Sequence, residues 1–582
     1  MSADLLRTQV ANVLVIGTGA AGLRAAIAAY QAGAQVVTIG KRPRLDAHTA
    51  LASGGINAAL GTRDPEDSWQ QHFADTMVEG YLLSDPRVVE VVAREAPGAV
   101  EELAAWGCGF ARTNDGRLDQ RYFGAHRWRR TCYAGDYTGR AVLQTLVNKV
   151  DALGIPVIDS QYVSHLLVAD GGCFGAFAFD LHDGHRTAFE ADAVVLCAGG
   201  HTRLWRRSSS RRDENFGDGI ALALHAGCRV MDMELVQFHP TGMVAPEEAA
   251  GTLVTEAVRG EGGRLYNASG ERFMARYDPG RMELSTRDRV ALANYTEIAE
   301  GRGGPHGGVF LDISHLAKEQ ILAKLPRMYR QFIEYQMLDI SRQRMEVAPT
   351  AHYSMGGVVV DPETHATEVA GLYAAGECTA GLHGANRLGG NSLTETVVYG
   401  RRAGEAAAAF SRSSEVVLRS RRAIDEAGDT LDALIRPGGE LARVIQRRLR
   451  DLMWERAGVV RDETGLRAGL VGVTELREAA GRVDVRPSAE GWTDLALALD
   501  LRGGLDAAET TMRGAVARRE SRGCHNRADI PALDPDLQVN FVSRRDENGT
   551  LELWGEPVEH VPPELEPWLV ADRVEAAGRL LE

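Results

Sequence analysis

The sequence predicts an α/β protein with a central parallel sheet, an inserted lobe and a helical region toward its C-terminal end. An apolar run at 12–17, a helix-forming stretch and a second apolar run at 34–40 have the pattern of a β-α-β unit. Two further buried runs, at 191–200 and 370–377, also end in glycines, which indicates one sheet assembled from separate segments. Beyond about residue 415, apolar residues recur at helical spacing.

The first strand and the first helix are joined by Gly17-x-Gly19-x-x-Gly22. Between a strand and a helix, these glycines permit a tight turn, close approach of the backbone to a pyrophosphate and tight helix packing. The acidic residue expected about 20 positions later, on the ribose of a dinucleotide, is missing. Gly40-Lys41 stands there instead, which disfavours a simple NAD site. We therefore expect a dinucleotide site rather than a purely structural turn.

The size and composition of the chain limit its class. A length of 582 residues requires several domains, and a net charge of -15 argues against a nucleic-acid partner. The seven cysteines form no CxxC pair, so neither a disulfide framework nor a cysteine-ligated metal is expected. The sequence shows no signal peptide and no apolar run near the roughly 20 residues of a membrane span, which predicts a cytoplasmic protein.

The order of segments predicts a discontinuous nucleotide-binding domain interrupted by a separate lobe. The lobe has mixed character and ends in the helical stretch "EQILAKLPRMYRQFIEYQ". Near the C-terminal end, Asn548-Gly549 between strand-like runs predicts a hairpin. The expected divisions are 1–240 and 350–415 for the nucleotide-binding domain, 241–349 for the lobe, 416–525 for a helical domain and 526–582 for a small β-hairpin tail domain.

Several polar motifs recur beside glycine or proline turns. Each has an ordinary structural explanation by itself, as a turn, an ion pair or a helix cap. Together, histidines and arginines in such positions are the groups that grip two carboxylates by charge-assisted hydrogen bonds. The residues are His239 in "QFHPTG", Thr255, Glu256 and Arg259 in "TEAVRGEGG", Arg287 in "STRD", His352 in "HYSMGG" and Arg387 in "HGANRLGGNSL".

From "VIGTGAAG" to "RESRGCHNRADIP", this ordered set of motifs resembles the flavoprotein subunit of succinate dehydrogenase and fumarate reductase, with the L-aspartate oxidases as close relatives. The resemblance runs nearly end to end. It implies a discontinuous Rossmann-like FAD-binding domain with an inserted α+β capping domain, followed by a helical domain and a small C-terminal domain. It also implies an enzyme that interconverts succinate and fumarate by hydride transfer to or from FAD.

The resemblance assigns His48, in "HTALASGG", a covalent bond to the 8α-methyl carbon of FAD, which would raise the reduction potential of the flavin. Ala47 replaces the serine usual before this histidine. Ser53 stands where the dehydrogenases carry glutamine and the fumarate reductases glutamate, which removes a cue to direction. The other implied FAD contacts are Gly17, Gly19, Ala20, Ala21, Gly22, Lys41, Thr49, Gly54, Gly55, Asp218, Glu377, Ser392 and Leu393.

The family's substrate roles transfer to matching residues here. Those implied to hold the two carboxylates are His239, Thr255, His352 and Arg387. Arg287 is implied to exchange a proton with the substrate. Because a guanidinium is ordinarily always protonated, Glu256 and Arg259 are implied to relay that proton. Closure of the capping domain would complete the site and exclude water.

Electrons need an exit, and the sequence contains no iron–sulfur ligand pattern. The resemblance implies a separate iron–sulfur subunit, membrane-anchor subunits with quinone, and a place on the cytoplasmic face of the membrane. Soluble fumarate reductases with other electron partners, and either working direction, stay open. L-aspartate oxidase is the rival function, but those enzymes lack the tethering histidine and place a glutamate where "RYFGAH" has Phe123. A non-catalytic flavin scaffold is disfavoured, because buried arginines without a ligand are costly to retain.

Overall fold

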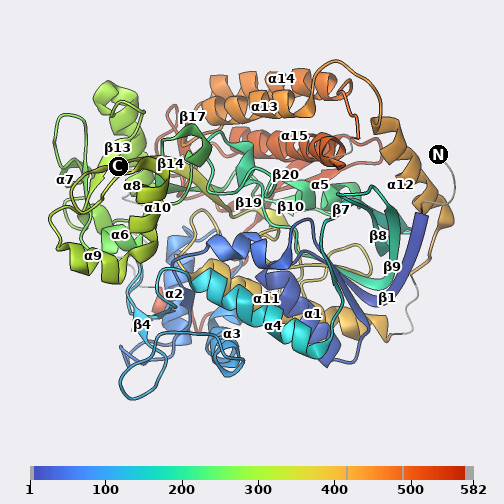
Figure 1. Ribbon diagram of the computed structural model, residues 1–582, viewed down its shortest axis with the longest axis horizontal. Helices are drawn as coiled ribbons and strands as arrows, with labels where there is room; N and C mark the ends of the chain where they lie inside the picture. The colour runs from blue at the N-terminus through green and yellow to red at the C-terminus, as the bar shows by residue number, and fades with distance from the viewer. Residues whose placement is uncertain (1–5, 414–416, 488–490, 570–582) are drawn as a thin grey trace.

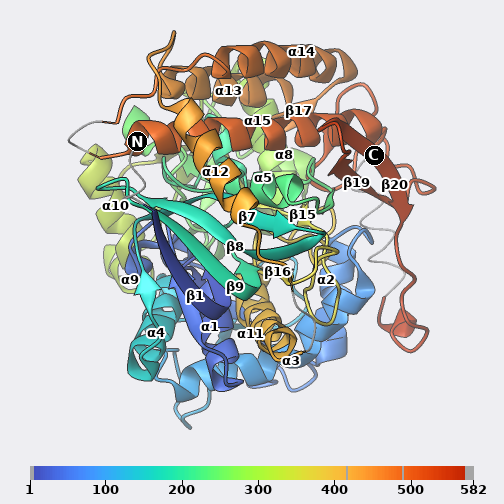
Figure 2. The same ribbon diagram turned by 90° about the vertical axis from the view of Figure 1, so that its right-hand side faces the viewer.

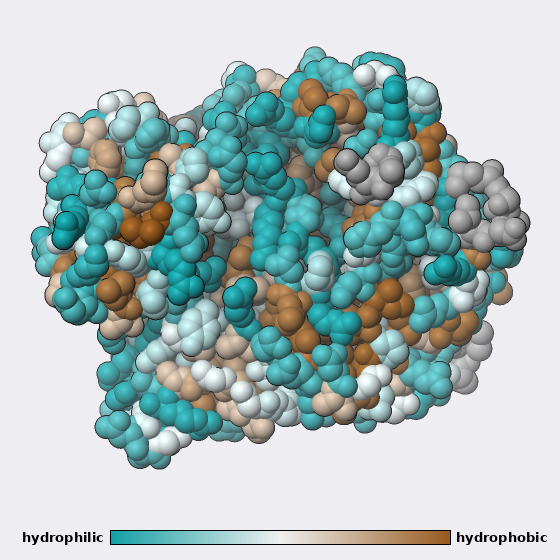
Figure 3. Space-filling model, in the orientation of Figure 1, coloured by the Kyte–Doolittle hydropathy of each residue, from teal (hydrophilic) through white to brown (hydrophobic). Residues whose placement is uncertain are grey.

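The computed structural model describes residues 6–413, 417–487 and 491–569. The ends of the first and last predicted domains, at 1–5 and 570–582, lie outside the described residues, as do 414–416 and 488–490 near and within the predicted helical domain. The molecule consists of a body and a lobe, and the lobe stands at the left in Figure 1. The face shown in Figure 3 is largely hydrophilic, with apolar residues in small separate groups.

The body is built on a seven-stranded sheet with the order β6-β2-β1-β9-β8-β7, and β16 also pairs with β9. The pairs that join β6, β2, β1, β9 and β16 are parallel, whereas β7 and β8 are antiparallel. The three predicted strand-to-glycine junctions follow β1, β9 and β16, which are neighbours, so the prediction of one sheet from separate segments is confirmed. The strands are β1 (Leu6–Ile16), β2 (Val36–Ile39), β6 (Val157–Ile158), β7 (Gln161–Ala169), β8 (Gly172–Asp180), β9 (Arg186–Leu196) and β16 (Leu372–Ala374).

Both faces of this sheet are buried, and β1 shows the alternation. Val13 and Val15 belong to one hydrophobic cluster with helices α1 (Ala20–Gln31) and α11 (Asn391–Ser411), whereas Leu14 and Ile16 belong to another on the opposite face. Figure 2 shows β1, β8 and β9 crossing the molecule, with α1 and α11 on one side and helices from the C-terminal part of the chain on the other. Continuous apolar sequence is therefore required along the strand, as predicted for a doubly covered parallel sheet.

Helices α1 (Ala20–Gln31) and α11 (Asn391–Ser411) cross at close range on one face of the sheet. Residues 20–29 of α1 are all buried. A Cβ atom on Gly404 would lie 2.2 Å from the carbonyl oxygen of Ala25, so the α11 backbone rests directly on α1. The same side of the body carries α2 (Trp69–Glu79), α3 (Pro86–Ala105), α4 (Thr138–Leu153) and a small sheet of β3 (Ile56–Asn57), β4 (Gln120–Arg121) and β5 (Thr131–Cys132).

The lobe is an antiparallel sheet with the order β11-β14-β13-β12, accompanied by short helices. Its hydrophobic cluster contains only residues between Met243 and Val347. The predicted boundaries at 240/241 and 349/350 fall inside the two strands that connect lobe and body, β11 and β14. The elements are β11 (Val236–Met243), α6 (Ala257–Gly260), β12 (Arg264–Tyr266), α7 (Met274–Tyr277), α8 (Arg287–Glu297), β13 (Val309–Asp312), α9 (Lys318–Lys324), α10 (Pro326–Gln336) and β14 (Met345–Ser354).

The C-terminal helices share a core with the body sheet. Leu449 and Leu501 belong to the same hydrophobic cluster as Leu14 and Val194. The predicted hairpin is confirmed, since β19 (Val539–Arg545) and β20 (Leu551–Pro557) pair in antiparallel register. It adds to β10 (Val230–Met231) and β15 (Gly357–Val358), so the predicted tail contributes strands to a sheet of the body. The helices are α5 (Asp218–His225), α12 (Arg421–Leu434), α13 (Ala442–Arg456), α14 (Glu463–Ala480) and α15 (Thr493–Ala517). None of the helices in the described ranges has the length and hydropathy of a membrane span.

Candidate active site

One long cavity runs from the carboxyl edge of the body sheet to the inner side of the lobe. It is lined by the β1–α1 turn, the segment after β2, the β9–α5 connection, β11, β14 and the start of α11. Every predicted FAD contact except Gly22 lines it, and so does every predicted substrate or proton-transfer residue except Arg259. The carboxyl edge of an open α/β sheet is where such folds bind ligands, because the strand order reverses there.

The glycines of the β1–α1 turn let the protein's own backbone pack closely around it. Gly17 has φ of 121°, and a Cβ atom there would lie 2.1 Å from the carbonyl oxygen of Cys197. Gly22 lies behind the turn, where a Cβ atom would lie 1.9 Å from the carbonyl oxygen of Gly17. Gly22 therefore permits packing beneath the cavity rather than contact within it. The Oγ1 of Thr49 accepts a hydrogen bond from the Ala20 amide at 3.0 Å, which fixes the start of α1.

Lys41 is held by carboxylates from distant parts of the chain. Its Nζ lies 3.3 Å from Oδ2 of Asp218 and 3.1 Å from Oδ1 of Asp500, which also accepts a hydrogen bond from the Tyr162 hydroxyl at 2.7 Å. Burial raises the pKa of Asp500 to about 6, although Lys41 opposes the shift. The other oxygen of Asp218, Oδ1, is buried and has no hydrogen-bond partner among the described residues. Asp218 thus supplies the free acidic oxygen that the segment after β2 lacks.

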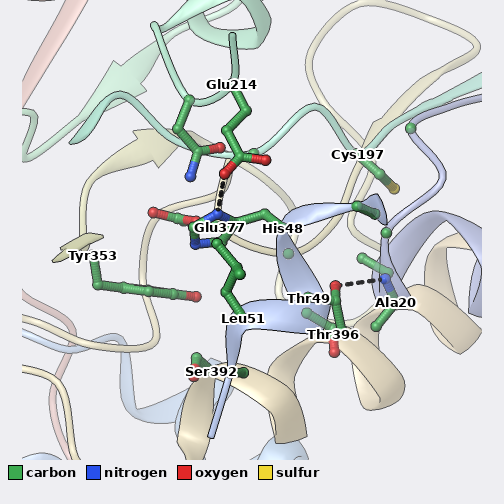
Figure 4. A pocket seen from close by; sticks show the side chains of 18 of the residues that line it. Ala20, His48, Thr49, Leu51, Cys197, Glu214, Tyr353, Glu377, Ser392 and Thr396 are labelled. Atoms are coloured by element: carbon green, nitrogen blue, oxygen red, sulfur yellow. Dashed lines mark hydrogen bonds and ion pairs between the residues drawn. The ribbon is translucent and has the colours of Figure 1, made fainter. Parts of the chain in front are cut away.

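His48 stands in a short 3₁₀ turn, His48–Leu51, with Glu214 beside it (Figure 4). Its Nδ1 lies 2.8 Å from Oε1 of Glu214, and 28% of the His48 side chain is exposed, toward the cavity. Burial would raise the pKa of Glu214, but the charge of His48 and the hydrogen bond from it lower that pKa to about 2. Conversely, burial would lower the pKa of His48, but Glu214 raises it.

At the lobe end of the cavity, two neutral histidines face each other. His239 on β11 and His352 on β14 have ring centroids 5.3 Å apart at an angle of 72°. Burial lowers both pKa values well below the ordinary range, and nearby arginines, Arg287 for His239 and Arg387 for His352, lower them further. Nδ1 of His239 lies 3.2 Å from the amide nitrogen and 3.3 Å from the carbonyl oxygen of Thr241, so Nε2 is the ring nitrogen that these contacts leave unoccupied. Nδ1 of His352 lies 2.9 Å from Oγ of Ser209.

Two arginines converge on one amide oxygen, Oε1 of Gln237. Arg387 donates to it from Nη2 at 2.9 Å, and Arg287 donates from Nη1 at 3.2 Å. Burial and the charge of Arg287 lower the pKa of Arg387 to about 10. Arg387 is 3% exposed, makes no ion pair with any described residue, and its Nε has no hydrogen-bond partner among them. A buried guanidinium in this state is suited to bind an anion from outside the chain.

Glu256 is paired with Arg287 and lies near Arg259. Its Oε2 accepts a hydrogen bond from Nε of Arg287 at 2.7 Å and lies 3.7 Å from Nη2 of Arg259. Burial would raise the pKa of Glu256, but Arg287 and Arg259 lower it to about 2. Arg259 lies behind Glu256, outside the cavity lining, and donates to the Glu283 carbonyl at 2.6 Å. The three guanidiniums and Glu256 therefore form a connected, positively charged chain.

The remaining predicted residues close the cavity. The aromatic ring of Phe123 packs against Gly54 and Gly389, where Cβ atoms would lie 2.5 Å and 2.6 Å from it. Gly55 has φ of 151°. Glu377 accepts a hydrogen bond from the Ser354 amide at 3.1 Å. Ser392, at the start of α11, accepts one from Arg387 at 3.1 Å, while Thr255 and Leu393 line the cavity beside these groups.

Comparison with known proteins decides the family. Residues 12–393 match the family model described as an FAD binding domain, and residues 446–567 match the one described as fumarate reductase flavoprotein C-term. A fumarate reductase (CoM/CoB) subunit from Methanothermobacter marburgensis is 43% identical over 92% of this chain and 97% of its own length. The fumarate reductase flavoprotein subunit of Escherichia coli is 36% identical over 99% of each chain. The chain belongs to the succinate dehydrogenase/fumarate reductase flavoprotein family.

Solved structures agree with this assignment of the flavoprotein subunit. Mycobacterium smegmatis Sdh1, determined in complex with UQ1, superposes with a TM-score of 0.88 at 40% identity, over 98% of both chains. A quinol-fumarate reductase with menaquinol molecules superposes with a TM-score of 0.89 at 35% identity, over 95% of this chain and 99% of that one. The protein is therefore a flavoprotein oxidoreductase, and its cofactor is FAD.

The residues that line the cavity of this flavoprotein subunit fit FAD. Gly17, Gly19 and the start of α1 line the cavity, so backbone amides there can reach a pyrophosphate. The unpartnered Oδ1 of Asp218 is an acceptor for ribose hydroxyls. The segment from His48 to Gly55 continues the lining toward the histidines and arginines. A flavin ring in that stretch would lie between the nucleotide end and the cationic end.

Three residues of the flavoprotein subunit were missed by sequence reasoning. Glu214 lies four positions before Asp218, but no spacing rule relates it to His48. Gln237 stands in the "QFHPTG" motif, where only the histidine was singled out. Asp500 lies in the first third of α15 and meets Lys41 across 459 positions, so only folding reveals the pair. The available signal for Asp500 was a carboxylate directly after the apolar run "LALAL" at 495–499.

Proposed function

We propose that this subunit interconverts succinate and fumarate, with FAD as the acceptor or donor of a hydride. The pair of arginines bridged by Gln237, beside two neutral histidines, is the observation that carries this proposal. Arg387 makes no ion pair with a described residue, although Glu377 and Glu256 attract it at longer range, and Arg287 and Arg259 share Glu256. Such an excess of buried positive charge matches a doubly anionic substrate.

In this proposal the carboxylates are held by residues from both parts of the molecule. Arg387, from the loop before α11, takes one carboxylate together with His352. His239 and Thr255 take the other from the side of the lobe. Neutral histidines suit this role, because they donate a hydrogen bond without requiring a further counter-charge. Fixing both ends of a four-carbon chain also fixes the position of its central bond.

When bound along the lining from His48 to Gly55, FAD would supply two-electron, hydride-transfer chemistry beside the central carbon–carbon bond of the substrate. The chain itself must then move one proton. We assign this step to Arg287, which donates a proton in the fumarate direction and accepts one in the succinate direction. Its Nε bond to Glu256, and the contact of Glu256 with Arg259, support a route by which the proton is resupplied or removed.

The lobe acts as a cap in this proposal. Its helix α10 meets the FAD-binding segment directly, since Nη1 of Arg327 donates to Oγ of Ser53 at 3.0 Å and the Arg327 amide donates to Asp136 at 3.1 Å. This contact holds the lobe over the middle of the cavity. Exclusion of water at this point would protect the reduced flavin and strengthen the charge interactions of the site.

The family relationship supports further parts of the proposal. We infer a covalent bond between His48 and FAD, transfer of electrons to an iron–sulfur subunit, and membrane-anchor subunits with quinone beyond it. The flavoprotein would then lie on the cytoplasmic face of the membrane through these partners. The working direction is set by the potentials of flavin and partner, and both directions use the same residues.

Substrate tests are made under anaerobic conditions with the purified protein. Succinate should bleach the flavin, and fumarate should reoxidise it, whereas L-aspartate should leave the spectrum unchanged. Bleaching by L-aspartate instead of succinate would assign the rival oxidase function. No response to succinate or L-aspartate, and no reoxidation of the chemically reduced flavin by fumarate, would indicate a flavin scaffold.

The tether is tested by acid precipitation. Flavin fluorescence should stay with the denatured chain and be absent in His48→Ala. Release of the flavin from the wild-type chain would refute the covalent bond and leave the substrate assignment standing.

A further inference from the structure

Glu214 is a buried carboxylate that the catalytic scheme above does not use. It lies in the segment between β9 and α5, and 7% of its side chain is exposed. Oε1 accepts two hydrogen bonds, from Nδ1 of His48 and from the Arg211 amide, each at 2.8 Å. Oε2 makes no hydrogen bond with a described residue, although guanidinium nitrogens of Arg211 and Arg42 lie 3.7 Å and 4.0 Å away. The carboxylate is thus directed at His48 by its surroundings.

This contact fixes which nitrogen of His48 carries the proton. Glu214 is ionised at neutral pH and can only accept, so Nδ1 of His48 must be the donor. A neutral His48 ring then has its lone pair on Nε2. No described residue hydrogen-bonds to Nε2, and His48 lines the cavity beside Glu377 and Leu51 (Figure 4). The nitrogen that remains free is the one available to a ligand.

A carboxylate on Nδ1–H also makes Nε2 a better electron-pair donor. Glu214 raises the pKa of His48, which means that Nε2 binds a proton more strongly when the carboxylate is present. The same gain applies to a carbon electrophile. Carboxylates that hold the far nitrogen of a histidine orient the ring and stabilise the positive charge that develops on it, both in metal sites and in hydrolytic triads.

We propose that Glu214 is the positioning residue that makes His48 competent to bond covalently to FAD. The proposal rests on the tether inferred above. It assigns Glu214 no part in succinate or fumarate chemistry.

The covalent step conserves atoms and electrons. A C–H bond of the flavin 8-methyl group breaks, and its proton moves to a nitrogen of the isoalloxazine ring. Nε2 of His48 then forms a bond to that carbon, and the isoalloxazine ring takes up the electron pair and is reduced. The imidazole becomes a cation with its Nδ1–H on Glu214, which compensates the charge. Fumarate, the proposed substrate, or dioxygen then removes two electrons and restores the oxidised flavin.

Three variants test the proposal in the full-length protein. Glu214→Gln keeps an acceptor of similar shape but removes the charge, Glu214→Ala removes both, and Glu214→Asp keeps the charge on a shorter side chain. Asp213→Ala is the matched control, because the neighbouring Asp213 is exposed and pairs with Arg42. The readouts are total FAD content, flavin fluorescence of the denatured chain and the intact mass of the chain.

We expect Glu214→Gln and Glu214→Ala to bind FAD but to show a tethered fraction at least tenfold below that of the wild type. Glu214→Asp should recover part of the tether, and Asp213→Ala should match the wild type. Added formate should increase tethering in Glu214→Ala, because it replaces the missing carboxylate. A merely structural role of Glu214 would not produce this rescue.

Full tethering in Glu214→Gln and Glu214→Ala would overturn the proposal while leaving the tether itself intact. The proposal would also be overturned, in favour of a structural role, if the Glu214 variants lose FAD altogether and neither the Glu214→Asp substitution nor added formate restores binding. If the wild-type chain releases its flavin on denaturation, the tether fails and the role of Glu214 fails with it.

Discussion

The two ends of the cavity differ in how their charges are compensated. At the nucleotide end, Lys41 is paired with Asp218 and Asp500, and His48 is paired with Glu214. At the lobe end, Arg387 has no ion pair with a described residue, while Arg287 and Arg259 share Glu256. A resident cofactor is bound once and can rest on prepaired groups. A substrate that must bind and leave is better served by charge that only the substrate compensates.

The largest effect is expected from removal of the uncompensated charge. Arg387→Ala should lower kcat/KM for succinate by about a thousandfold, since the loss of one partner of a buried charged hydrogen-bonded pair costs about 2–5 kcal/mol. FAD content should not change, because the nucleotide end is separate. Steady-state kinetics and the visible spectrum provide the measurement. Arg330→Ala, at an exposed position of α10, is the control. Equal activity of the two variants would contradict the assignment of the lobe end as the substrate site.

Glu256→Gln should affect turnover more than binding. Without an ionisable partner for Arg287, proton exchange slows, and kcat should fall about a hundredfold while KM changes little. A proportionate rise in KM would show that Glu256 contributes to substrate binding rather than to proton transfer.

The pH dependence of stability gives an independent test of Glu256. Its pKa is about 2 in the folded chain, below the ordinary value near 4.5. The unfolded chain therefore binds more protons between these pH values, so the stabilisation is fully present above pH 4.5 and is lost as the pH falls toward 2. Urea unfolding should show a stability gap between wild type and Glu256→Gln at pH 6 that narrows at pH 3.5. A gap that is unchanged with pH would show that the carboxylate charge is not its source.

A moderate effect is expected at the nucleotide end, where Lys41 is paired with Asp218 and Asp500. Asp500→Asn leaves Lys41 with one carboxylate and should reduce the stability of the FAD-loaded protein by about 1–3 kcal/mol, the usual range for an unsatisfied buried partner. The KM for succinate should stay at the wild-type value. The stability of the FAD-loaded protein is measured by thermal unfolding, monitored through flavin fluorescence. A changed KM would mean that the two ends are coupled rather than separate.

The smallest effect is expected at the contact between cap and body. Arg327→Ala removes the hydrogen bond to Ser53, worth about 1 kcal/mol, and should lower kcat/KM by about fivefold. Reaction of the reduced flavin with oxygen should become faster, because the cavity is less well closed. The control is again Arg330→Ala. If stopped-flow oxidation rates of the two variants agree, closure does not depend on this contact.

Much of the fold and part of the site were predictable from local sequence. The glycines of the first turn, the apolar runs β1, β9 and β16, and the Asn548-Gly549 hairpin are local signals, and the structure follows them. The motifs around His239, His352 and Arg387 were also visible, since each stands beside a turn. Their convergence in space was not visible, because β11 and β14 are separated by more than a hundred positions and Arg387 comes from a third segment, the loop before α11. The resemblance to a known family, rather than spacing, brought them together.

The sequence by itself determined the class of the sheet, the position of the dinucleotide turn and the identity of the charged groups. These follow from periodicity and from glycine stereochemistry, which act between near neighbours. Only the tertiary structure decided which charges are paired. Lys41 meets Asp500, His48 meets Glu214, and Arg387 meets no carboxylate among the described residues. Electrostatic compensation depends on distance in space and on burial, and neither is set by distance along the chain.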